Sequence, residues 1–178
     1  GDIIDVAKTP IFENETAGEL TSRLADIGAE LLLEVIDKLE SGTITYAKQE
    51  QFDATVTNKI SKTDATIIWN KSSKEIKCLI LGTNPNPIAR TTLNGELVKI
   101  YKAKLTNIEL SAESMAAEPG TILAESSVKQ GVFVKTADGA IEITEIQLPG
   151  GKILPAKDVL NGRKIKVGDK FVTNLVVG

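Results

Sequence analysis

The sequence predicts an α+β protein: a five-stranded, OB-like antiparallel β-barrel preceded by a strand and a helix that are the remnant of a larger α/β domain. Two observations predict this architecture, and a third distinguishes its two parts. A capped amphipathic helix follows a short apolar stretch near the beginning of the chain. Short strands with tight-turn signals, in the order of a meander, fill most of the second half. The net charge also changes sign between the two parts.

The first apolar stretch is predicted to be a strand. Ile3, Ile4, Val6 and Ile11 occur with polar residues among them, and the strand is expected to end at Pro10. A helix over residues 16–41 is expected next, because Thr16-Ala17-Gly18-Glu19 matches a capping box. Apolar residues then recur at helical spacing, and a glycine follows where a left-handed C-terminal cap would need it.

The second half of this helix is apolar around more than one face, which is typical of a helix covered on several sides. A single strand cannot cover it, and a lone strand cannot satisfy its own backbone groups. Residues 1–41 are therefore predicted to be the last strand and helix of an α/β domain whose other strands lie upstream. The alternative is that the helix packs on the barrel.

Residues 42–60 lack a sustained period and are predicted to be an extended linker. A short helix should follow, because Ser72-Ser73-Lys74-Glu75 is a second capping box before an apolar face that ends at Gly82. We expect Trp69 to pack this helix onto the barrel, and Cys78 to be a small buried side chain within it.

The barrel is expected to occupy residues 61–178. Its predicted strands are residues 91–93, 96–105, 121–124, 131–136 and 140–148. Asn94-Gly95 supplies the two positive φ angles of a type I′ turn, and Asp138-Gly139 marks a second hairpin. In the last strand the apolar positions change from odd to even numbers, which predicts a bulge near Thr144-Glu145. One or two helical turns should follow Pro155.

Composition limits the chemistry of the chain. It has 178 residues, 42% hydrophobic and 25% charged, as is typical of soluble globular proteins. No stretch resembles a signal peptide or a membrane span, so a cytoplasmic protein is expected. Histidine is absent and Cys78 is the only cysteine, which excludes serine triads, Cys/His dyads and zinc clusters of these residues. We therefore expect no metal-binding residue.

The charge distribution suggests a polyanionic partner for the second part. Residues 1–58 hold 4 Lys and Arg against 12 Asp and Glu, a charge of −8, whereas residues 59–178 hold 17 against 12, a charge of +5. Because aromatic residues are only 4% of the chain, RNA contacts should be mainly electrostatic rather than by base stacking. The candidate RNA-binding residues are Lys59, Lys62, Lys152, Lys157, Arg163 and Lys164.

Several stretches in order resemble the methionyl-tRNA formyltransferase family and together cover nearly the whole chain. The beginning of the chain, with Thr16-Ala17-Gly18-Glu19-Leu20, is similar to the end of the family's catalytic domain. The most specific later stretches are Pro119-Gly120-Thr121-Ile122, Leu148-Pro149-Gly150-Gly151-Lys152, Ala156-Lys157-Asp158 and Asn161-Gly162-Arg163.

The resemblance implies a formyl transferase that moves a formyl group from 10-formyltetrahydrofolate to the methionine on initiator tRNA. It also implies that the C-terminal barrel, similar to an OB-fold, holds the tRNA through basic residues. The family's catalytic asparagine, histidine and aspartate have no counterpart in these residues, so the resemblance implies no catalytic and no cofactor-binding residue in this chain. We therefore expect a monomeric piece of the enzyme that holds the tRNA-positioning domain and is inactive alone.

Two alternatives remain open. A relative that formylates an amine on a sugar nucleotide would not need its C-terminal domain to touch RNA. An OB-like barrel can also be a protein- or saccharide-binding module, because the fold alone does not choose a ligand.

Overall fold

The computed structural model describes residues 1–49, 52 and 54–173. The chain divides into two compact units, Gly1–Lys59 and Ile60–Gly178. These units are called the N-terminal arm and the sheet domain.

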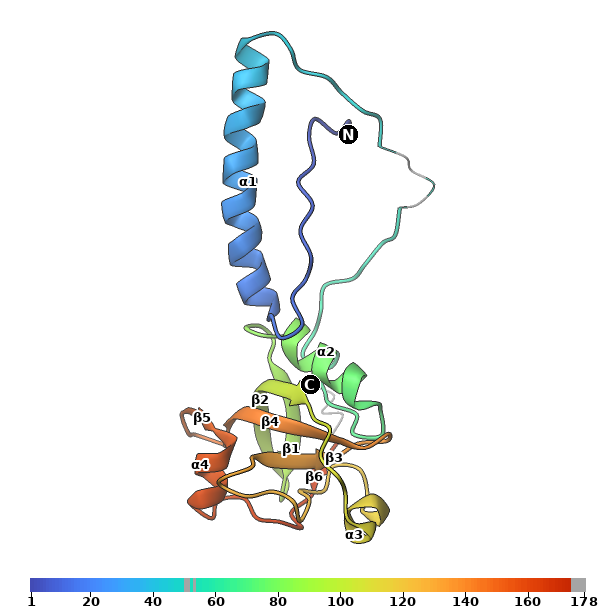
Figure 1. Cartoon of the computed structure of the whole chain (residues 1–178), viewed down its shortest axis with the longest axis vertical. Coiled ribbons are helices and arrows are strands. Elements are labelled where there is room, and N and C mark those ends of the chain that lie inside the picture. Colours follow the sequence, from blue (N-terminus) through green and yellow to red (C-terminus); the bar gives the residue numbers. More distant parts are fainter. Residues whose placement is uncertain (50–51, 53, 174–178) are drawn as a thin grey trace. The chain divides into compact units, whose positions relative to one another are not determined.

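The arm is dominated by the predicted long helix, α1 (Ala17–Glu40) (Figure 1). Thr16 is its N-cap, and both hydrogen bonds of the predicted capping box are present. The Thr16 hydroxyl accepts from the Glu19 N–H at 3.2 Å, and the Glu19 carboxylate accepts from the Thr16 N–H at 2.8 Å. After the C-cap Ser41, Gly42 adopts the positive φ (67°) that this kind of helix end requires.

The strand predicted near the beginning of the arm is not formed. Only Ile3 is paired there, in an isolated antiparallel bridge with Ala47 whose two hydrogen bonds are 2.7 and 2.8 Å long. Strand backbone needs a neighbour along its length, and this stretch has one at a single residue. Ion pairs between Lys38 and Asp5 and between Arg23 and Glu15 connect the stretch and the turn after it to α1.

No residue of α1 is buried. Four large apolar side chains in its second half, Leu32, Leu33, Ile36 and Leu39, are exposed. Contiguous exposed apolar surface of this kind is typical of an interaction face. The helix therefore presents the apolar surface that its sequence predicts.

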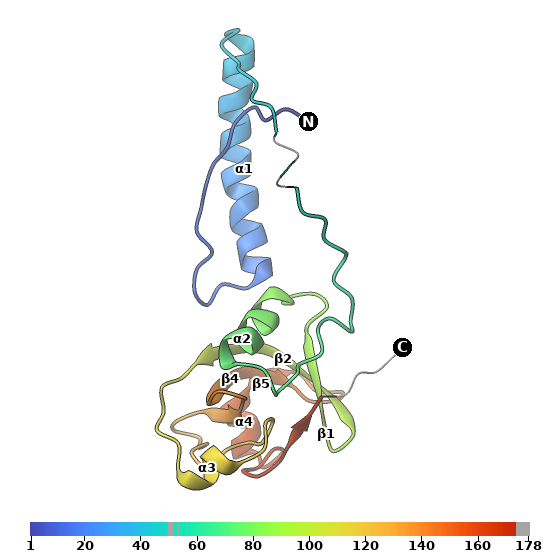
Figure 2. The ribbon, with the colours of Figure 1, turned by 90° about the vertical axis from the view of Figure 1, so that its right-hand side faces the viewer.

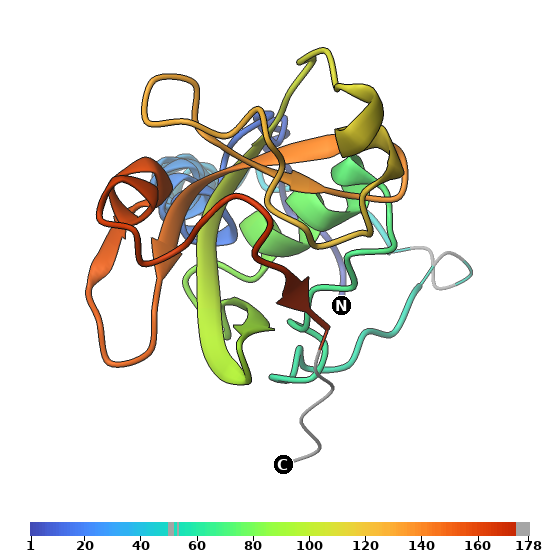
Figure 3. The ribbon, with the colours of Figure 1, turned by 90° about the horizontal axis from the view of Figure 1, so that it is seen from below.

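The sheet domain is built on one curled antiparallel sheet (Figures 1 and 3). Its strands are β1 (Ala89–Leu93), β2 (Glu96–Leu105), β3 (Val132–Lys135), β4 (Ala140–Gln147), β5 (Ile153–Pro155) and β6 (Phe171–Val172). Its helices are α2 (Ser73–Gly82), α3 (Ala112–Ala116) and α4 (Ala156–Asn161). The strand order is β3-β4-β2-β1-β6, with β5 on β4. The expected simple meander is wrong, because β4 lies between β2 and β3.

The predicted hairpins and bulge are confirmed. Asn94 and Gly95 have φ values of 53° and 82° and join β1 to β2 in the register of a two-residue turn. In β4, Ile143 pairs with Ala103 and Glu145 with Lys102, which leaves Thr144 as the extra residue of a bulge. A second irregularity, at Tyr101 in β2, was not predicted.

Residues 121–124 form isolated bridges instead of the predicted strand. Thr121 pairs with Lys170 and Ile122 with Val134. The segment joins the two edges of the sheet: the Gly120 N–H donates to Lys135 O beside β3 at 2.8 Å, and Gly120 O accepts from Phe171 N–H in β6 at 2.9 Å. The edges are thus partly covered by backbone hydrogen bonds.

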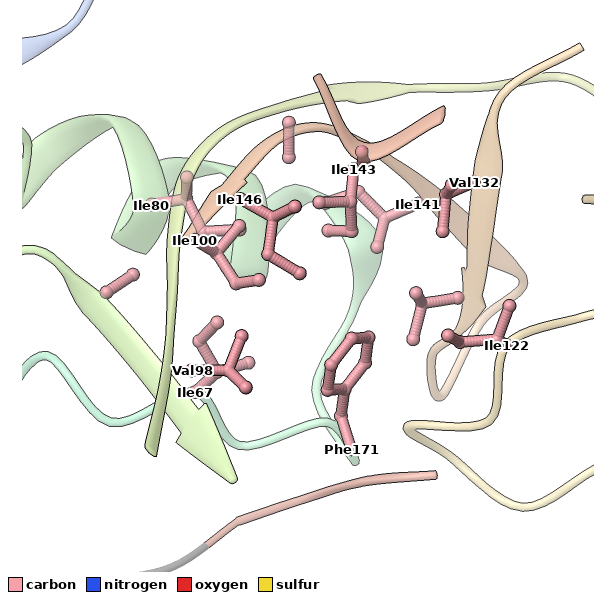
Figure 4. Close-up of a cluster of buried hydrophobic side chains, with 14 of the residues drawn as sticks. Ile67, Ile80, Val98, Ile100, Ile122, Val132, Ile141, Ile143, Ile146 and Phe171 are labelled. Atoms are coloured by element: carbon pink, nitrogen blue, oxygen red, sulfur yellow. The ribbon is translucent and has the colours of Figure 1, made fainter. Parts of the chain in front are cut away.

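The core lies inside the curl of the sheet and is closed by α2 (Figures 2 and 4). Side chains from the strands point toward one another there, including Ile100, Ile143 and Ile146 (Figure 4). Trp69 is 2% exposed and stacks on Phe171 with 5.6 Å between ring centroids. Its Nε1–H donates to Thr91 Oγ1 at 2.9 Å. Trp69 therefore packs in the core, as predicted.

Cys78 is exposed, so the prediction that it is buried is wrong. The face of α2 that packs inward carries Ile76 and Ile80, both buried. At about 100° per residue, Cys78 lies about 200° around the helix from each of them. It therefore points away from the core.

Glu125 connects the loop after α3 to the beginning of that helix. Its carboxylate accepts from the Ser111 N–H at 2.7 Å and from the Ser114 hydroxyl at 2.5 Å. These hydrogen bonds, above all the one from Ser114, lower the pKa of Glu125 from 4.5 to about 2.

Glu125→Gln is expected to destabilise the sheet domain near neutral pH and much less in acid. Because the pKa of Glu125 is lower in the folded chain, its stabilising effect is present above about pH 4.5 and lost as the pH falls toward about 2. Urea unfolding of the wild type and the variant over this range should show converging midpoints. A difference in midpoint that is the same at every pH would contradict the role of the charged form.

Candidate nucleic-acid interface

Four of the six predicted RNA-binding residues gather at one end of the sheet domain. Lys152 lies between β4 and β5, Lys157 lies in α4, and Arg163 and Lys164 follow α4; all four are exposed. Strand β5 and α4 are neighbours in space (Figure 1). Among the described residues, none of the four forms an ion pair, so their charges are free to meet an anion. This group of residues is called the α4 cluster.

The backbone under the α4 cluster is held in a defined shape. Ala156 and Val159 of α4 are buried and anchor the helix on the core. After α4, Arg163 N–H donates to Leu160 O at 3.0 Å and Lys164 N–H donates to Val159 O at 3.1 Å. Arg163 has a φ of 55°, which turns the chain sharply at this point. Arg163 and Lys164 therefore lie on a fixed turn, and Lys157 lies on an anchored helix.

The other two predicted residues lie elsewhere. Lys62 is exposed in the turn that leads to Thr66, which pairs with Arg90 of β1. Because β2 and β4 separate β1 from β5, Lys62 is not part of the α4 cluster. Lys59 is exposed and is the last residue of the arm.

The outer face of the sheet carries basic residues that the sequence analysis missed. Val98 and Ile100 of β2 point into the core, so Lys99 between them points outward. Lys99 lies opposite Arg90 in β1 and Gln147 in β4. The signal was available in the sequence, because a two-residue turn at Asn94-Gly95 fixes this register of the hairpin.

A hollow of about 370 Å³ beside α2 is lined by Asp64, Thr66, Ile68, Lys71, Glu75, Ile76, Cys78 and Leu79. In the part of the chain that the structure describes, no group of three or more Cys, Asp or Glu side chains could hold a metal ion. No described helix is both long and apolar enough to cross a membrane.

Comparison with known proteins gives a family. Residues 59–164 match the model of the formyl transferase C-terminal domain. The methionyl-tRNA formyltransferase of Methylobacillus flagellatus is 41% identical over 163 residues, which are 91% of this chain and 50% of that protein. The enzyme of the same name from Stutzerimonas stutzeri is 38% identical over 178 residues, 100% of this chain and 52% of that protein. The chain thus spans about half the length of these relatives.

Solved structures show the same fold. A variant of HypX from Aquifex aeolicus has a TM-score of 0.68 at 20% identity, and covers 94% of this chain and 30% of its own. HypX in complex with tetrahydrofolic acid has a TM-score of 0.56 at 22% identity, and covers 79% of this chain and 26% of its own. At this identity the likeness concerns the fold alone.

A curled antiparallel sheet closed by a capped helix, with a basic cluster at one end, defines a small α+β domain that presents positive charge on a rigid frame. The family match makes this specific. The chain belongs to the formyl transferase family and carries its C-terminal domain.

Proposed function

We propose that the chain is the C-terminal half of a methionyl-tRNA formyltransferase and that its sheet domain, as an OB-like barrel, holds the initiator tRNA. The observation that carries the proposal is the continuous match, over both units, to proteins of that name. The whole protein would transfer a formyl group from 10-formyltetrahydrofolate to the amino group of methionyl initiator tRNA. It would act as a monomer in the cytoplasm.

The α4 cluster supports electrostatic tRNA binding. Its four cations lie before β5, in α4 and on the turn after α4, and none has an acidic partner among the described residues. Such residues neutralise phosphates and orient the nucleic acid without reading its sequence. Trp69 is buried in the core, so this side chain offers no platform for base stacking. Lys59 and Lys62 would add further phosphate contacts.

We further propose that the arm is the end of the catalytic domain. Its relatives match through this segment, and α1 exposes an apolar face of the kind that packs inside a larger domain. The 178 residues contain no histidine, so the catalytic histidine implied by the family resemblance is not among them. We expect tRNA binding and no formyl transfer from these residues alone.

Binding of tRNA by the full chain is expected to weaken steeply as salt rises. If the four cations of the α4 cluster each contact a phosphate, they contribute about −3 to −4 to the slope of log affinity against log salt. Replacing Lys152, Lys157, Arg163 and Lys164 together by glutamine should remove most of that contribution. Filter binding at several salt concentrations measures both slopes.

Lys71→Gln is the matched control, because Lys71 is already paired with Glu75 at 3.2 Å. It should leave the slope nearly unchanged. Absent or salt-independent binding by the wild type would refute the RNA-binding proposal, and would favour a sugar-amine formyltransferase or a protein- or saccharide-binding module.

A further inference from the structure

The outer face of β2 carries three lysines, and two of them have an acid directly across the sheet. Lys102 pairs with Glu145 of β4 at 3.9 Å, and Lys104 pairs with Glu142 of β4 at 3.2 Å. Lys99, in the same strand, faces the neutral Gln147 in β4. Of these three lysines, Lys99 is therefore the one whose positive charge has no acidic residue opposite it in β4.

The other neighbour of Lys99 adds charge. Arg90 of β1 lies directly opposite Lys99, so the two side chains leave the sheet on the same face. No described residue forms an ion pair with either of them. Like charges placed directly opposite in a sheet are destabilising, so folding brings two cations together at a cost in free energy. An anion between them would remove that cost.

The hydrogen-bonding groups of Arg90, Lys99 and Gln147, which lie side by side across the sheet, are only partly satisfied. Arg90 donates one guanidinium N–H, from Nη2, to Pro87 O at 3.2 Å, while its Nε is buried without a hydrogen-bond partner. A buried donor without a partner is costly, so the Arg90 guanidinium is not fully stabilised by groups of the chain. Gln147 is fixed beside Lys99, because its Oε1 accepts from the Tyr101 hydroxyl at 3.0 Å and its Nε2 donates to Gly151 O at 2.8 Å.

We propose that Arg90 and Lys99 form a phosphate-binding pair on the outer face of β1 and β2. This rests on the proposed function in one respect, which is that the phosphate belongs to the backbone of an RNA. The planar guanidinium can offer two N–H groups to two oxygens of one phosphate. The ammonium of Lys99 supplies the second positive charge from the adjacent strand.

The pair lies on a line that leads to the α4 cluster. Lys99 is opposite Gln147, and Gln147 is opposite Ile153 of β5, the residue after Lys152. With strands about 4.8 Å apart, the distance across the sheet from β1 to β5 is about 14 Å. An RNA backbone that contacts Lys152 of the α4 cluster can therefore reach Arg90 and Lys99 across this face. The pair extends the interface from the α4 cluster onto the sheet itself.

The first test is tRNA binding by the full chain at low salt. Lys99→Gln and Arg90→Lys should each lower the affinity about 3- to 10-fold, and Lys99→Gln should reduce the magnitude of the salt slope by about 1. Arg90→Lys keeps the charge but loses the planar fork. Lys104→Gln, on the same face but paired with Glu142, is the matched control and should change neither quantity.

The second test uses inorganic phosphate and does not depend on RNA. Phosphate, compared with chloride at equal ionic strength, should raise the Tm of the wild type and of Lys104→Gln, and raise that of Lys99→Gln much less. Without phosphate, Lys99→Gln should melt at the same or a higher temperature than the wild type, because the repulsion has been removed. A merely structural role for Lys99 would lower the Tm in both conditions.

The outcomes separate the two proposals. If tRNA binds the wild type and all three single variants equally, and phosphate stabilises all of them equally, the phosphate pair is refuted while the proposed function stands. If no tRNA binds but phosphate stabilisation is lost in Lys99→Gln, the pair is supported as an anion site and the RNA assignment fails.

Discussion

Gly120→Ala is expected to destabilise the sheet domain by about 3 kcal/mol or more. A Cβ at this position would lie 2.2 Å from the carbonyl oxygen of Phe171 and 3.3 Å from Cδ1 of Trp69. The φ of 93° adds strain for any residue with a side chain. The backbone must move to relieve the clash, and that would break the hydrogen bonds of Gly120 with Lys135 and Phe171. Urea unfolding followed by fluorescence of the single tryptophan measures the loss.

Gly95→Ala is the matched control for this prediction. Gly95 also has a positive φ, 82°, but nothing lies within 4 Å of an added Cβ. Only the conformational cost of about 1–2 kcal/mol should remain. An equal loss in free energy of unfolding for Gly120→Ala and Gly95→Ala would contradict this prediction. The close contacts of Gly120 would then not be what joins the two edges of the sheet.

Trp69→Ala should cost about 3–5 kcal/mol, in the range of buried aromatic truncations. The change removes the stack on Phe171 and the hydrogen bond to Thr91, and it leaves a cavity in the hydrophobic core. Since a typical domain is stable by only about 5–15 kcal/mol, much of the population should unfold under mild denaturant. Denaturation followed by far-UV circular dichroism gives the difference.

Trp69→Phe separates the two contributions. It keeps a ring on Phe171 but loses the donor to the Thr91 hydroxyl, so a loss of about 1–2 kcal/mol is expected. The Thr91 hydroxyl keeps another partner, because it also donates to Val172 O at 3.0 Å. A loss as large as that of Trp69→Ala would mean that the hydrogen bond, and not the packing, dominates.

Local signals in the sequence were reliable guides to local structure. Both capping boxes, at Thr16 and Ser72, mark true helix starts, because the hydrogen bonds involved join residues three positions apart. The β1–β2 hairpin follows from the conformational preference of Asn94-Gly95. The bulge at Thr144 follows from the change in parity of the apolar positions.

Non-local pairing was not predictable in the same way. Strand β6 is two residues long and pairs with Leu93 and Thr92 of β1, far earlier in the chain. The sequence of β6 does not itself indicate that β1 is its partner. The neighbour of β2 in the sheet is β4 and not β3. This choice of neighbour is also decided by the packing of the whole sheet. The predicted strand at residues 1–10 shows the opposite error. Its apolar pattern suits a strand, but it lacks a neighbouring strand along its length.

The candidate interface was predictable in part. The turn that bears Arg163 and Lys164 could be singled out from its sequence, whereas its gathering with Lys152 needed the pairing of β5 with β4. Arg90 and Lys99 were overlooked because each is unremarkable alone. It becomes clear that Arg90 and Lys99 lie opposite each other only when the residue pairs of the β1–β2 hairpin are written out.

The contact between Ile67 and Thr173 bears on how the protein is made. The Thr173 hydroxyl donates to Ile67 O at 2.9 Å across 106 positions of the chain, next to the pairing of β6 with β1. Contacts of such high sequence separation slow folding, since a large loop must close before they form. During synthesis, α2 and the β1–β2 hairpin can form on the ribosome early. The apolar inner surface of these elements then stays exposed to solvent and chaperones until residues 171–173 emerge from the exit tunnel.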